Sequence, residues 1–150
     1  MKVGDKIYYG SEKNQHTDEI EKDKYGYYGR YLLNNAKSEH YKTIEELVQS
    51  YVKCKYWFYV SVESSGEIKE FKNIEKELLT KGQVVTEDNC YGEPYYSDAP
   101  GADEITIKTI KYNGSLYYVK QVRQEIFKKE PGKPLQTSYG EEKLTIKLLD

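Results

Sequence analysis

Histidine, the usual proton shuttle near neutral pH, is scarce in this sequence. His16 and His40 are its only histidines, and both lie in polar, loop-like sequence. Neither has the spacing to a cysteine or to a second histidine that a metal site requires. We therefore expect both to be solvated surface residues, and we expect no metal site.

The two cysteines do not form a redox or metal-binding motif. Cys54 and Cys90 lie 36 positions apart, with no further cysteine near either, so we predict two unpaired thiols. Cys54 lies between Lys53 and Lys55, and nearby positive charge stabilises a reactive thiolate. Lysines at the end of a helix also favour solubility and the helix dipole, and we favour this second interpretation.

Other catalytic patterns are absent from the sequence. Residues 25–30, Tyr-Gly-Tyr-Tyr-Gly-Arg, contain two glycines but no Lys-Ser/Thr and no third glycine, so they do not form a nucleotide-binding loop. Adjacent acids such as Glu45 and Glu46 point in different directions on a helix or strand and rarely share a proton. No serine-hydrolase elbow or zinc-protease signature occurs. The sequence therefore predicts a protein that is not an enzyme and needs no cofactor.

Residues 87–104 are the most unusual segment of the chain. They contain six acids and no Lys or Arg. A loop of this length is usually functional or disordered, while its tyrosines are typical of contact surfaces and its acids would attract a basic groove. A mobile solvated loop and a partner-binding surface both remain open, whereas the spacing does not match a calcium-binding loop. The candidate binding residues are Glu87, Asp88, Tyr91, Glu93, Tyr95, Tyr96, Asp98, Asp103 and Glu104.

Basic residues gather instead toward the C-terminus and could line one side of a hairpin there. A formal net charge of −2, with 21 Lys and only two Arg, argues against direct binding to DNA or RNA. The basic residues are Lys108, Lys111, Lys120, Arg123, Lys128, Lys129 and Lys133.

Local signals predict two helices. Thr43 and Glu46 have the spacing of a capping box, and an apolar stripe follows over residues 44–52, so we expect a helix that ends near Lys53. Asn73 is suited to cap a second helix over residues 74–81.

Extended segments surround these helices. Residues 3–9, 25–33, 56–62, 68–71, 84–85, 105–112, 115–122 and 144–149 have strand-forming composition. Asn113-Gly114 predicts a type I′ hairpin in which Lys111 faces Leu116. Gly26 and Gly29 indicate a bulge or a close backbone approach. Residues 10–24 are polar apart from Ile20, and we expect a surface loop there.

Together these elements predict a single α+β domain over residues 1–150. Its sheet should be twisted, mostly antiparallel and of about five to seven strands, with two short helices packed on it. Leu, Ile, Val and Phe number 32 of 150 residues, so the 17 tyrosines must help to complete the core. No run of residues is apolar enough to span a membrane, and residues 1–6 lack the apolar core of a signal peptide, so we expect a cytoplasmic protein.

Two C-terminal segments carry a family resemblance. Residues 111–119, Lys-Tyr-Asn-Gly-Ser-Leu-Tyr-Tyr-Val, and residues 142–150, Glu-Lys-Leu-Thr-Ile-Lys-Leu-Leu-Asp, resemble parts of small phage-borne inhibitors of CRISPR effector nucleases, the anti-CRISPR proteins. The resemblance implies a non-catalytic protein of a phage or mobile element, acting in the cytoplasm of its bacterial host. It also implies that residues 87–104 dock into a basic, nucleic-acid-binding site of a larger defence protein. This chain departs from the most acidic of these inhibitors because it is nearly neutral overall.

A second class of function stays open beside the inhibitor. Tyr-rich strands with Arg30 or Arg123 could form a pocket for a small ligand or a nucleotide. Ligand binding to the folded state would then raise the melting temperature of the isolated protein.

Overall fold

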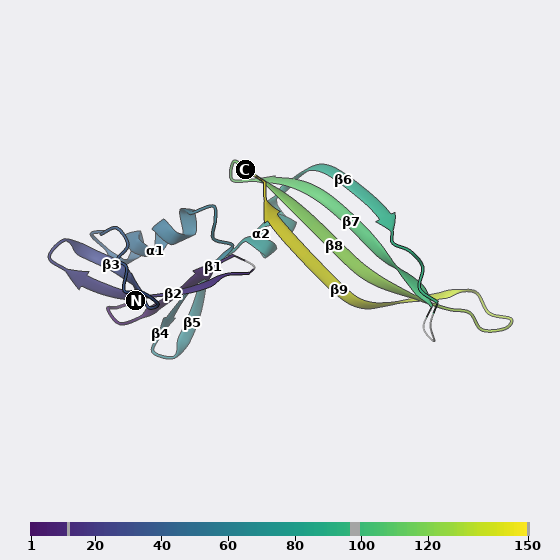
Figure 1. Ribbon diagram of the computed structural model, residues 1–150, viewed down its shortest axis with the longest axis horizontal. Coiled ribbons are helices and arrows are strands. Elements are labelled where there is room, and N and C mark those ends of the chain that lie inside the picture. The colour runs from purple at the N-terminus through teal and green to yellow at the C-terminus, as the bar shows by residue number, and fades with distance from the viewer. Residues whose placement is uncertain (12, 97–99, 150) are drawn as a thin grey trace. The chain divides into compact units, whose positions relative to one another are not determined.

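The computed structural model describes residues 1–11, 13–96 and 100–149 (Figure 1). The chain divides into two compact units, Met1–Leu79 and Thr80–Asp150, where the sequence analysis expects one domain. The α+β class and the mostly antiparallel pairing are confirmed. The strands, however, form one five-stranded and one four-stranded sheet among the described residues, in place of a single sheet of five to seven strands.

The first unit is an antiparallel sheet covered by a helix. Its sheet has the order β3-β2-β1-β4-β5, and helix α1 contacts β3 and β4. Helix α2 crosses the boundary between the units. The bounds are β1 (Lys6–Gly10), β2 (Gln15–Asp23), β3 (Gly26–Tyr31), α1 (Ile44–Lys53), β4 (Tyr59–Ser64), β5 (Glu67–Asn73) and α2 (Ile74–Lys81).

Helix α1 supplies one side of the first unit's core. Thr43 is its N-cap, and the Thr43 side chain accepts a hydrogen bond from the Glu46 backbone N–H at 3.1 Å, as the capping signal predicts. The predicted apolar stripe faces inward. Its buried members pack with residues of β1, β2 and β4, and the cluster contains Ile7, Tyr9, Ile20, Ile44, Leu47, Val48, Tyr51, Val60 and Val62.

Strand β2 corrects the expected loop over residues 10–24. Its nine residues pair with β1 on one side and β3 on the other, so its backbone polar groups are satisfied within the sheet. Asp18 and Ile20 are buried and their neighbours face outward. The alternation of apolar and polar residues that usually indicates a strand is not visible in this sequence, because one of the two buried positions is an aspartate.

The second unit is a four-stranded antiparallel sheet with the order β6-β7-β8-β9 (Figure 1). The Asn113-Gly114 turn has φ angles of 48° and 77°, which fit a type I′ turn. The predicted register is confirmed, since Lys111 lies opposite Leu116 and Ile110 opposite Tyr117. The strands are β6 (Gln83–Tyr91), β7 (Gly101–Tyr112), β8 (Ser115–Lys128) and β9 (Gln136–Leu148).

Neither α1 nor α2, the helices in the described part of the chain, has the length and apolarity that crossing a membrane requires.

Candidate binding surface of the second unit

Half of the acidic segment is strand, which corrects the expectation of an eighteen-residue loop. Residues 87–91 belong to β6 and residues 101–104 to β7, and the two strands pair antiparallel with Glu87 opposite Lys108 and Tyr91 opposite Glu104. Only residues 92–100 connect them. Residues 87–91 can form a strand because the backbone of β7 offers them a continuous row of hydrogen-bonding partners. As part of an edge strand, they can still keep their side chains in water.

The nine predicted binding residues do not form one surface. Successive side chains on a strand point to opposite faces, so the register places Glu87, Tyr91 and Glu104 on one face and Asp88 and Asp103 on the other. We call these the Glu104 face and the Asp103 face. The connection carries Glu93, Tyr95 and Tyr96, while Asp98 lies outside the described residues.

A compact ionic cluster lies on the Glu104 face. Arg123 Nη2 donates to Glu104 Oε2 at 2.8 Å and lies 3.9 Å from Glu125 Oε1. The guanidinium carbon also sits 4.0 Å from the centre of the Tyr139 ring, and Asn89 Nδ2 donates to Glu104 Oε1 at 3.1 Å. The charge of Glu104 is therefore neutralised inside the protein. Glu104 is a structural partner rather than an open binding charge.

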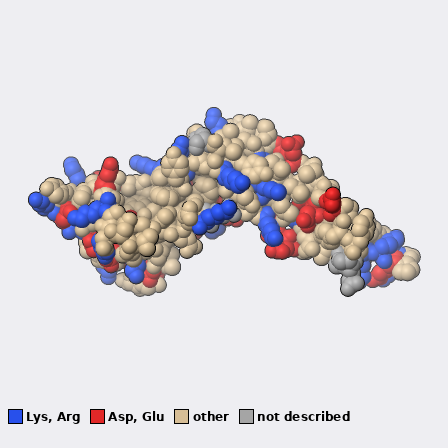
Figure 2. Space-filling view, in the orientation of Figure 1, with Lys and Arg blue, Asp and Glu red and all other residues tan. Residues whose placement is uncertain are grey.

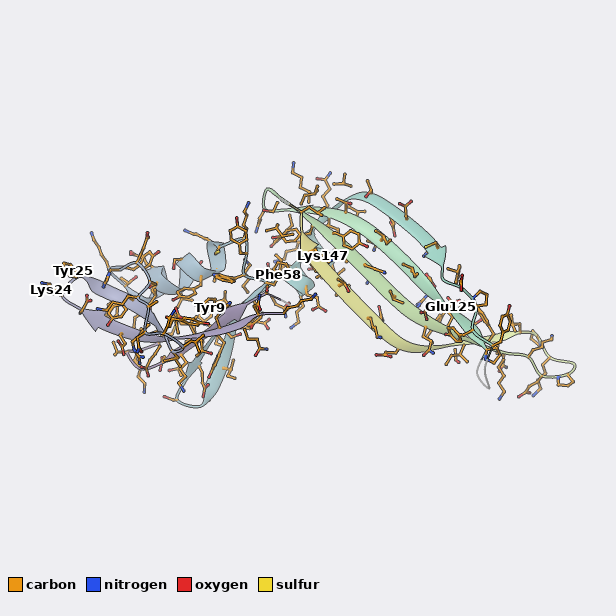
Figure 3. All side chains as sticks on the ribbon, viewed as in Figure 1. Tyr9, Lys24, Tyr25, Phe58, Glu125 and Lys147 are labelled. Carbon is orange, nitrogen blue, oxygen red and sulfur yellow. The ribbon has the colours of Figure 1, made fainter. Side chains whose placement is uncertain are left out.

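The pKa values in this cluster move apart. Hydrogen bonding to Arg123 lowers the pKa of Glu104, whereas a hydrogen bond shared with Glu104, together with burial, raises the pKa of Glu125. Glu125 is labelled in Figure 3, and its side chain is only 9% exposed. Of the two carboxyls, Glu125 therefore takes up a proton first as the pH falls.

This difference predicts an unusual pH dependence of stability. Because the pKa of Glu125 is raised in the folded protein, the protonated side chain stabilises the fold. This stabilisation is complete below the ordinary pKa of a glutamate and is lost as the pH rises through the raised pKa. We therefore expect Glu125→Gln, which resembles the protonated form, to raise the melting temperature by a few degrees at pH 7 and to have no effect near pH 4. Thermal melts followed by circular dichroism at both pH values measure this.

Glu104→Gln is the matched control for this prediction. The lowered pKa of Glu104 means that its stabilising charge is present at pH 7 and lost as the pH falls, so this variant should melt at a lower temperature at pH 7. A lower melting temperature for Glu125→Gln at pH 7 would contradict the assignment of the shared proton.

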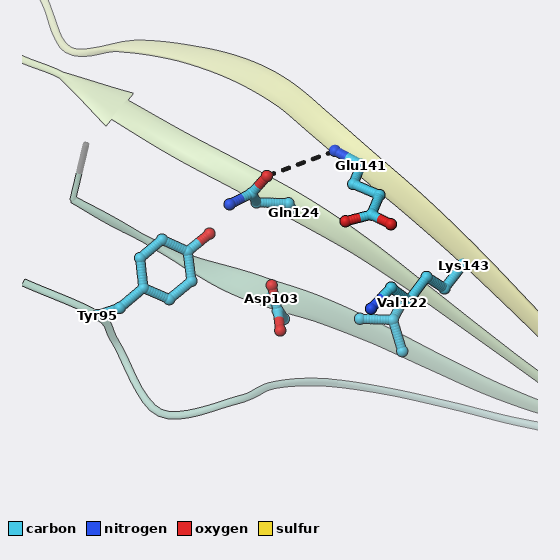
Figure 4. Close-up of a pocket in the computed structure, with 6 residues that line it drawn as sticks. All are labelled: Tyr95, Asp103, Val122, Gln124, Glu141 and Lys143. Atoms are coloured by element: carbon cyan, nitrogen blue, oxygen red, sulfur yellow. Dashed lines mark hydrogen bonds between the residues drawn. The ribbon is translucent and has the colours of Figure 1, made fainter. Parts of the chain in front are cut away.

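The Asp103 face has a polar hollow of about 280 Å³ (Figure 4). Tyr95 is one of the residues that line this hollow. Its backbone exchanges a pair of hydrogen bonds with Gly101, and its hydroxyl donates to the Glu125 carbonyl at 3.2 Å. Tyr95 is therefore an anchor of the connection rather than a free contact residue. The hollow is lined by Tyr95, Asp103, Val122, Gln124, Glu141 and Lys143.

Three of the predicted acids keep unneutralised charge. Among the residues that the structure describes, Asp88, Glu93 and Asp103 have no cationic side chain within 4 Å, whereas Glu87 lies 3.8 Å from Lys108 Nζ. Figure 2 shows acidic side chains along β6 and the connection that follows it. Exposed aromatic surface accompanies them, because Tyr91 is 57% exposed and Tyr96 is 90% exposed.

Strand β6 is also an open edge. Among the described residues it pairs only with β7, and each of its nine residues is exposed. An edge strand presents a row of backbone N–H and C=O groups that can pair with another chain. This open edge is the geometric feature that sequence reasoning missed, because residues 87–91 had no strand-like alternation.

No family model, curated protein or solved structure matches this chain.

The predicted basic residues and the two cysteines are not gathered in one place. The predicted basic stripe is divided, because the register puts Lys108 and Arg123 on the Glu104 face and Lys111 and Lys120 on the Asp103 face. Both cysteines are free: Cys54 is half-buried and Cys90 is exposed on β6.

The histidines correct an expectation, since both are half-buried and hydrogen-bonded. His40 Nε2 lies 2.9 Å from Asp23 Oδ2, and His16 Nδ1 lies 3.0 Å from the Tyr31 hydroxyl. Among the described residues, no three His, Cys, Asp or Glu side chains are grouped as metal ligands.

Part of this arrangement could have been predicted from the hairpin. Extending the register from Lys111 opposite Leu116 puts Glu104 opposite Arg123, a pair with opposite charges. Tyr139 could not be found in this way, because the pairing of β8 with β9 shifts its register between Arg123 and Glu125, and the Pro131-Gly132 turn between these strands does not specify that shift.

Proposed function

We propose that this protein is a non-catalytic binding protein that uses the β6 side of its second unit to contact a basic surface of a larger protein. The observation that carries the proposal is the open edge of β6, whose nine residues are all exposed. A partner strand added to this edge would gain main-chain hydrogen bonds, which is a recurring mode of protein recognition.

Charge supplies the preference for a basic partner. Asp88, Glu93 and Asp103 lie on or beside the edge without cationic neighbours among the described residues. Such charges speed association with a positive surface and disfavour other partners. They also disfavour the pairing of two copies of this chain through β6, because like charges would meet.

Exposed tyrosines supply contact area. Tyr91 ends β6, and Tyr96 lies in the connection with most of its ring in solvent. Tyrosine is enriched among the residues that dominate binding energy at interfaces. The resemblance of the C-terminal segments to anti-CRISPR proteins extends the proposal to its partner, a CRISPR effector nuclease with a basic nucleic-acid channel.

Charge reversal tests this proposal. Each of a panel of purified effector nucleases, with and without guide RNA, is titrated against the protein by biolayer interferometry. We expect wild type to bind one member, and we expect Asp88→Lys/Glu93→Lys/Asp103→Lys to bind it about 100-fold more weakly, from roughly 1 kcal/mol for each charge.

The control changes the same amount of charge elsewhere. Glu45→Lys/Glu67→Lys/Glu75→Lys alters three exposed acids of the first unit and the start of α2, and it should bind like wild type. If both variants bound the effector equally weakly, the change in net charge alone would explain the loss of affinity, and the β6 side would have no specific role. Unchanged affinity of the β6-side variant, or no binding by wild type to any effector, would refute the proposal as stated.

A further inference from the structure

The first unit contains an aromatic pocket that the binding surface of the second unit does not use. Its volume is about 420 Å³, within the range of small-molecule sites. Five aromatic rings and one carboxylate line it, together with Lys37 and several smaller side chains. The rings and the carboxylate belong to Tyr9, Asp18, Tyr31, Tyr41, Tyr51 and Trp57.

One residue that lines the pocket is a buried carboxylate held by two phenols. Asp18 is 4% exposed. The Tyr9 hydroxyl donates to Asp18 Oδ1 at 2.8 Å, and the Tyr51 hydroxyl donates to Oδ2. Burial, together with hydrogen bonding to Asp18, raises the pKa of both tyrosines, so both remain protonated donors at neutral pH.

No cationic side chain of the described residues neutralises Asp18 within 4 Å. Lys37 lines the pocket, but its Nζ lies 3.5 Å from Asp23 Oδ2 and 4.8 Å from the centre of the Tyr28 ring. Burying a carboxylate is costly unless it is paired as well as hydrogen-bonded. Two phenols satisfy part of this requirement, and a cation in the pocket would satisfy the rest.

The rings around the carboxylate stand in different planes. Tyr9 meets Tyr51 edge to face, with ring centres 4.8 Å apart at 70°, and meets Trp57 at 5.0 Å and 66°. Tyr9, labelled in Figure 3, is thus the centre of an aromatic cluster. Rings set at steep angles let a compact cation contact more than one π face, as in aromatic cages for quaternary ammonium groups.

The backbone is adapted to this arrangement at Gly29. A Cβ at this position would lie 2.0 Å from the Tyr51 hydroxyl oxygen and 2.8 Å from Asp18 Oδ2. The Gly29 N–H is held by Ser38 Oγ at 2.8 Å, and Ser38 lines the pocket. The close approach that the sequence suggested at Gly29 is therefore to the Tyr51 phenol and the Asp18 carboxylate, whereas Gly26 closely approaches the backbone of Tyr41.

We propose that this pocket binds a small methylated ammonium ion of the choline type. A buried negative charge disfavours phosphates and carboxylates, which argues against a nucleotide in this pocket. Arg30 does not offset that charge, because its guanidinium is hydrogen-bonded to Glu19 at 2.7 Å and to Glu21 at 3.0 Å. Methyl groups on nitrogen need no hydrogen-bond acceptor, so the ion matches aromatic walls around a single carboxylate.

Two native side chains report binding. Trp57 is the only tryptophan of the chain and lines the pocket, so its fluorescence should change when the pocket fills. Cys54 also lines the pocket, so in a Cys90→Ser background its alkylation by iodoacetamide should slow in the presence of ligand.

Isothermal titration calorimetry with choline tests the proposal, and 3,3-dimethylbutanol is the uncharged isostere. We expect saturable choline binding that protects Cys54, and binding of the isostere at least about tenfold weaker. If choline and 3,3-dimethylbutanol bound equally well, the pocket would recognise apolar shape and not positive charge, which would overturn the proposal. No binding of choline at millimolar concentration would also overturn the proposal.

Variants separate the carboxylate from the rings. Asp18→Asn removes the charge while keeping an acceptor, and it should weaken choline binding about tenfold or more with unchanged circular dichroism. If Asp18→Asn does not fold, Trp57→Leu decides the question against its matched control Tyr56→Leu, an exposed neighbour outside the pocket. Equal choline affinity of these two variants would refute the cage.

The source of the ammonium group forms a second arm of the titration. Free trimethyllysine with lysine as its control, and phosphatidylcholine vesicles, are compared with choline. Tighter binding of choline than of trimethyllysine or the vesicles would support a free choline-type ion as the ligand. Tighter binding of trimethyllysine or of the vesicles would instead identify that compound as the ligand and overturn the assignment to a free choline-type ion.

Discussion

Leu47→Ala is expected to lower the free energy of unfolding of the first unit by about 2 to 5 kcal/mol. Leu47 is 0% exposed and lies on the inward face of α1 among the core residues. Its truncation removes apolar contacts and leaves a cavity that a helix held against a sheet cannot close. Urea denaturation followed by Trp57 fluorescence measures the change, because the single tryptophan lies in this unit.

Leu33→Ala is the control for this experiment. Leu33 is 82% exposed, so its replacement should change the free energy of unfolding by less than about 0.5 kcal/mol. A cost below about 1 kcal/mol for Leu47→Ala would mean that α1 does not complete the core as described.

Gly29→Ala should destabilise the first unit by about 3 kcal/mol, although alanine is usually better than glycine within a strand. The added Cβ would lie 2.0 Å from the Tyr51 hydroxyl oxygen. The phenol would have to move, which strains the packing of α1 and breaks a hydrogen bond to a buried charge. The same denaturation assay measures the loss.

A double-mutant cycle identifies the cause of this effect. Tyr51→Phe removes the hydroxyl that the new Cβ would meet but keeps the ring. Gly29→Ala should therefore cost less in the Tyr51→Phe background than in wild type. Additive costs in the two backgrounds would assign the effect to the strand itself and not to the phenol.

Elements with local determinants were predictable from the sequence. The Asn113-Gly114 turn specifies both the hairpin and its register, because its two residues tolerate the positive φ angles that the turn needs. Helix α1 begins after Thr43 and ends at Lys53 as predicted, since capping and apolar periodicity lie within a few residues of each other.

Elements that depend on distant partners were not predictable. Strand β2 has polar sequence, and its pairing with β1 and β3 satisfies its backbone. The acidic residues 87–91 are a strand because β7 lies beside them. Their side chains look like those of a loop because edge strands keep them in solvent.

The sequence by itself determined the α+β class, the hairpin register, helix α1 and the place of the acidic, Tyr-bearing segment. Only the tertiary structure decided that the acids of this segment lie on two faces of a sheet, with Glu104 neutralised by Arg123. It alone brought Asp18, Tyr9 and Tyr51 together around the space at Gly29. The physical reason is that propensity and spacing act over a few residues, whereas strand pairing and helix packing bring together side chains that are far apart in the chain.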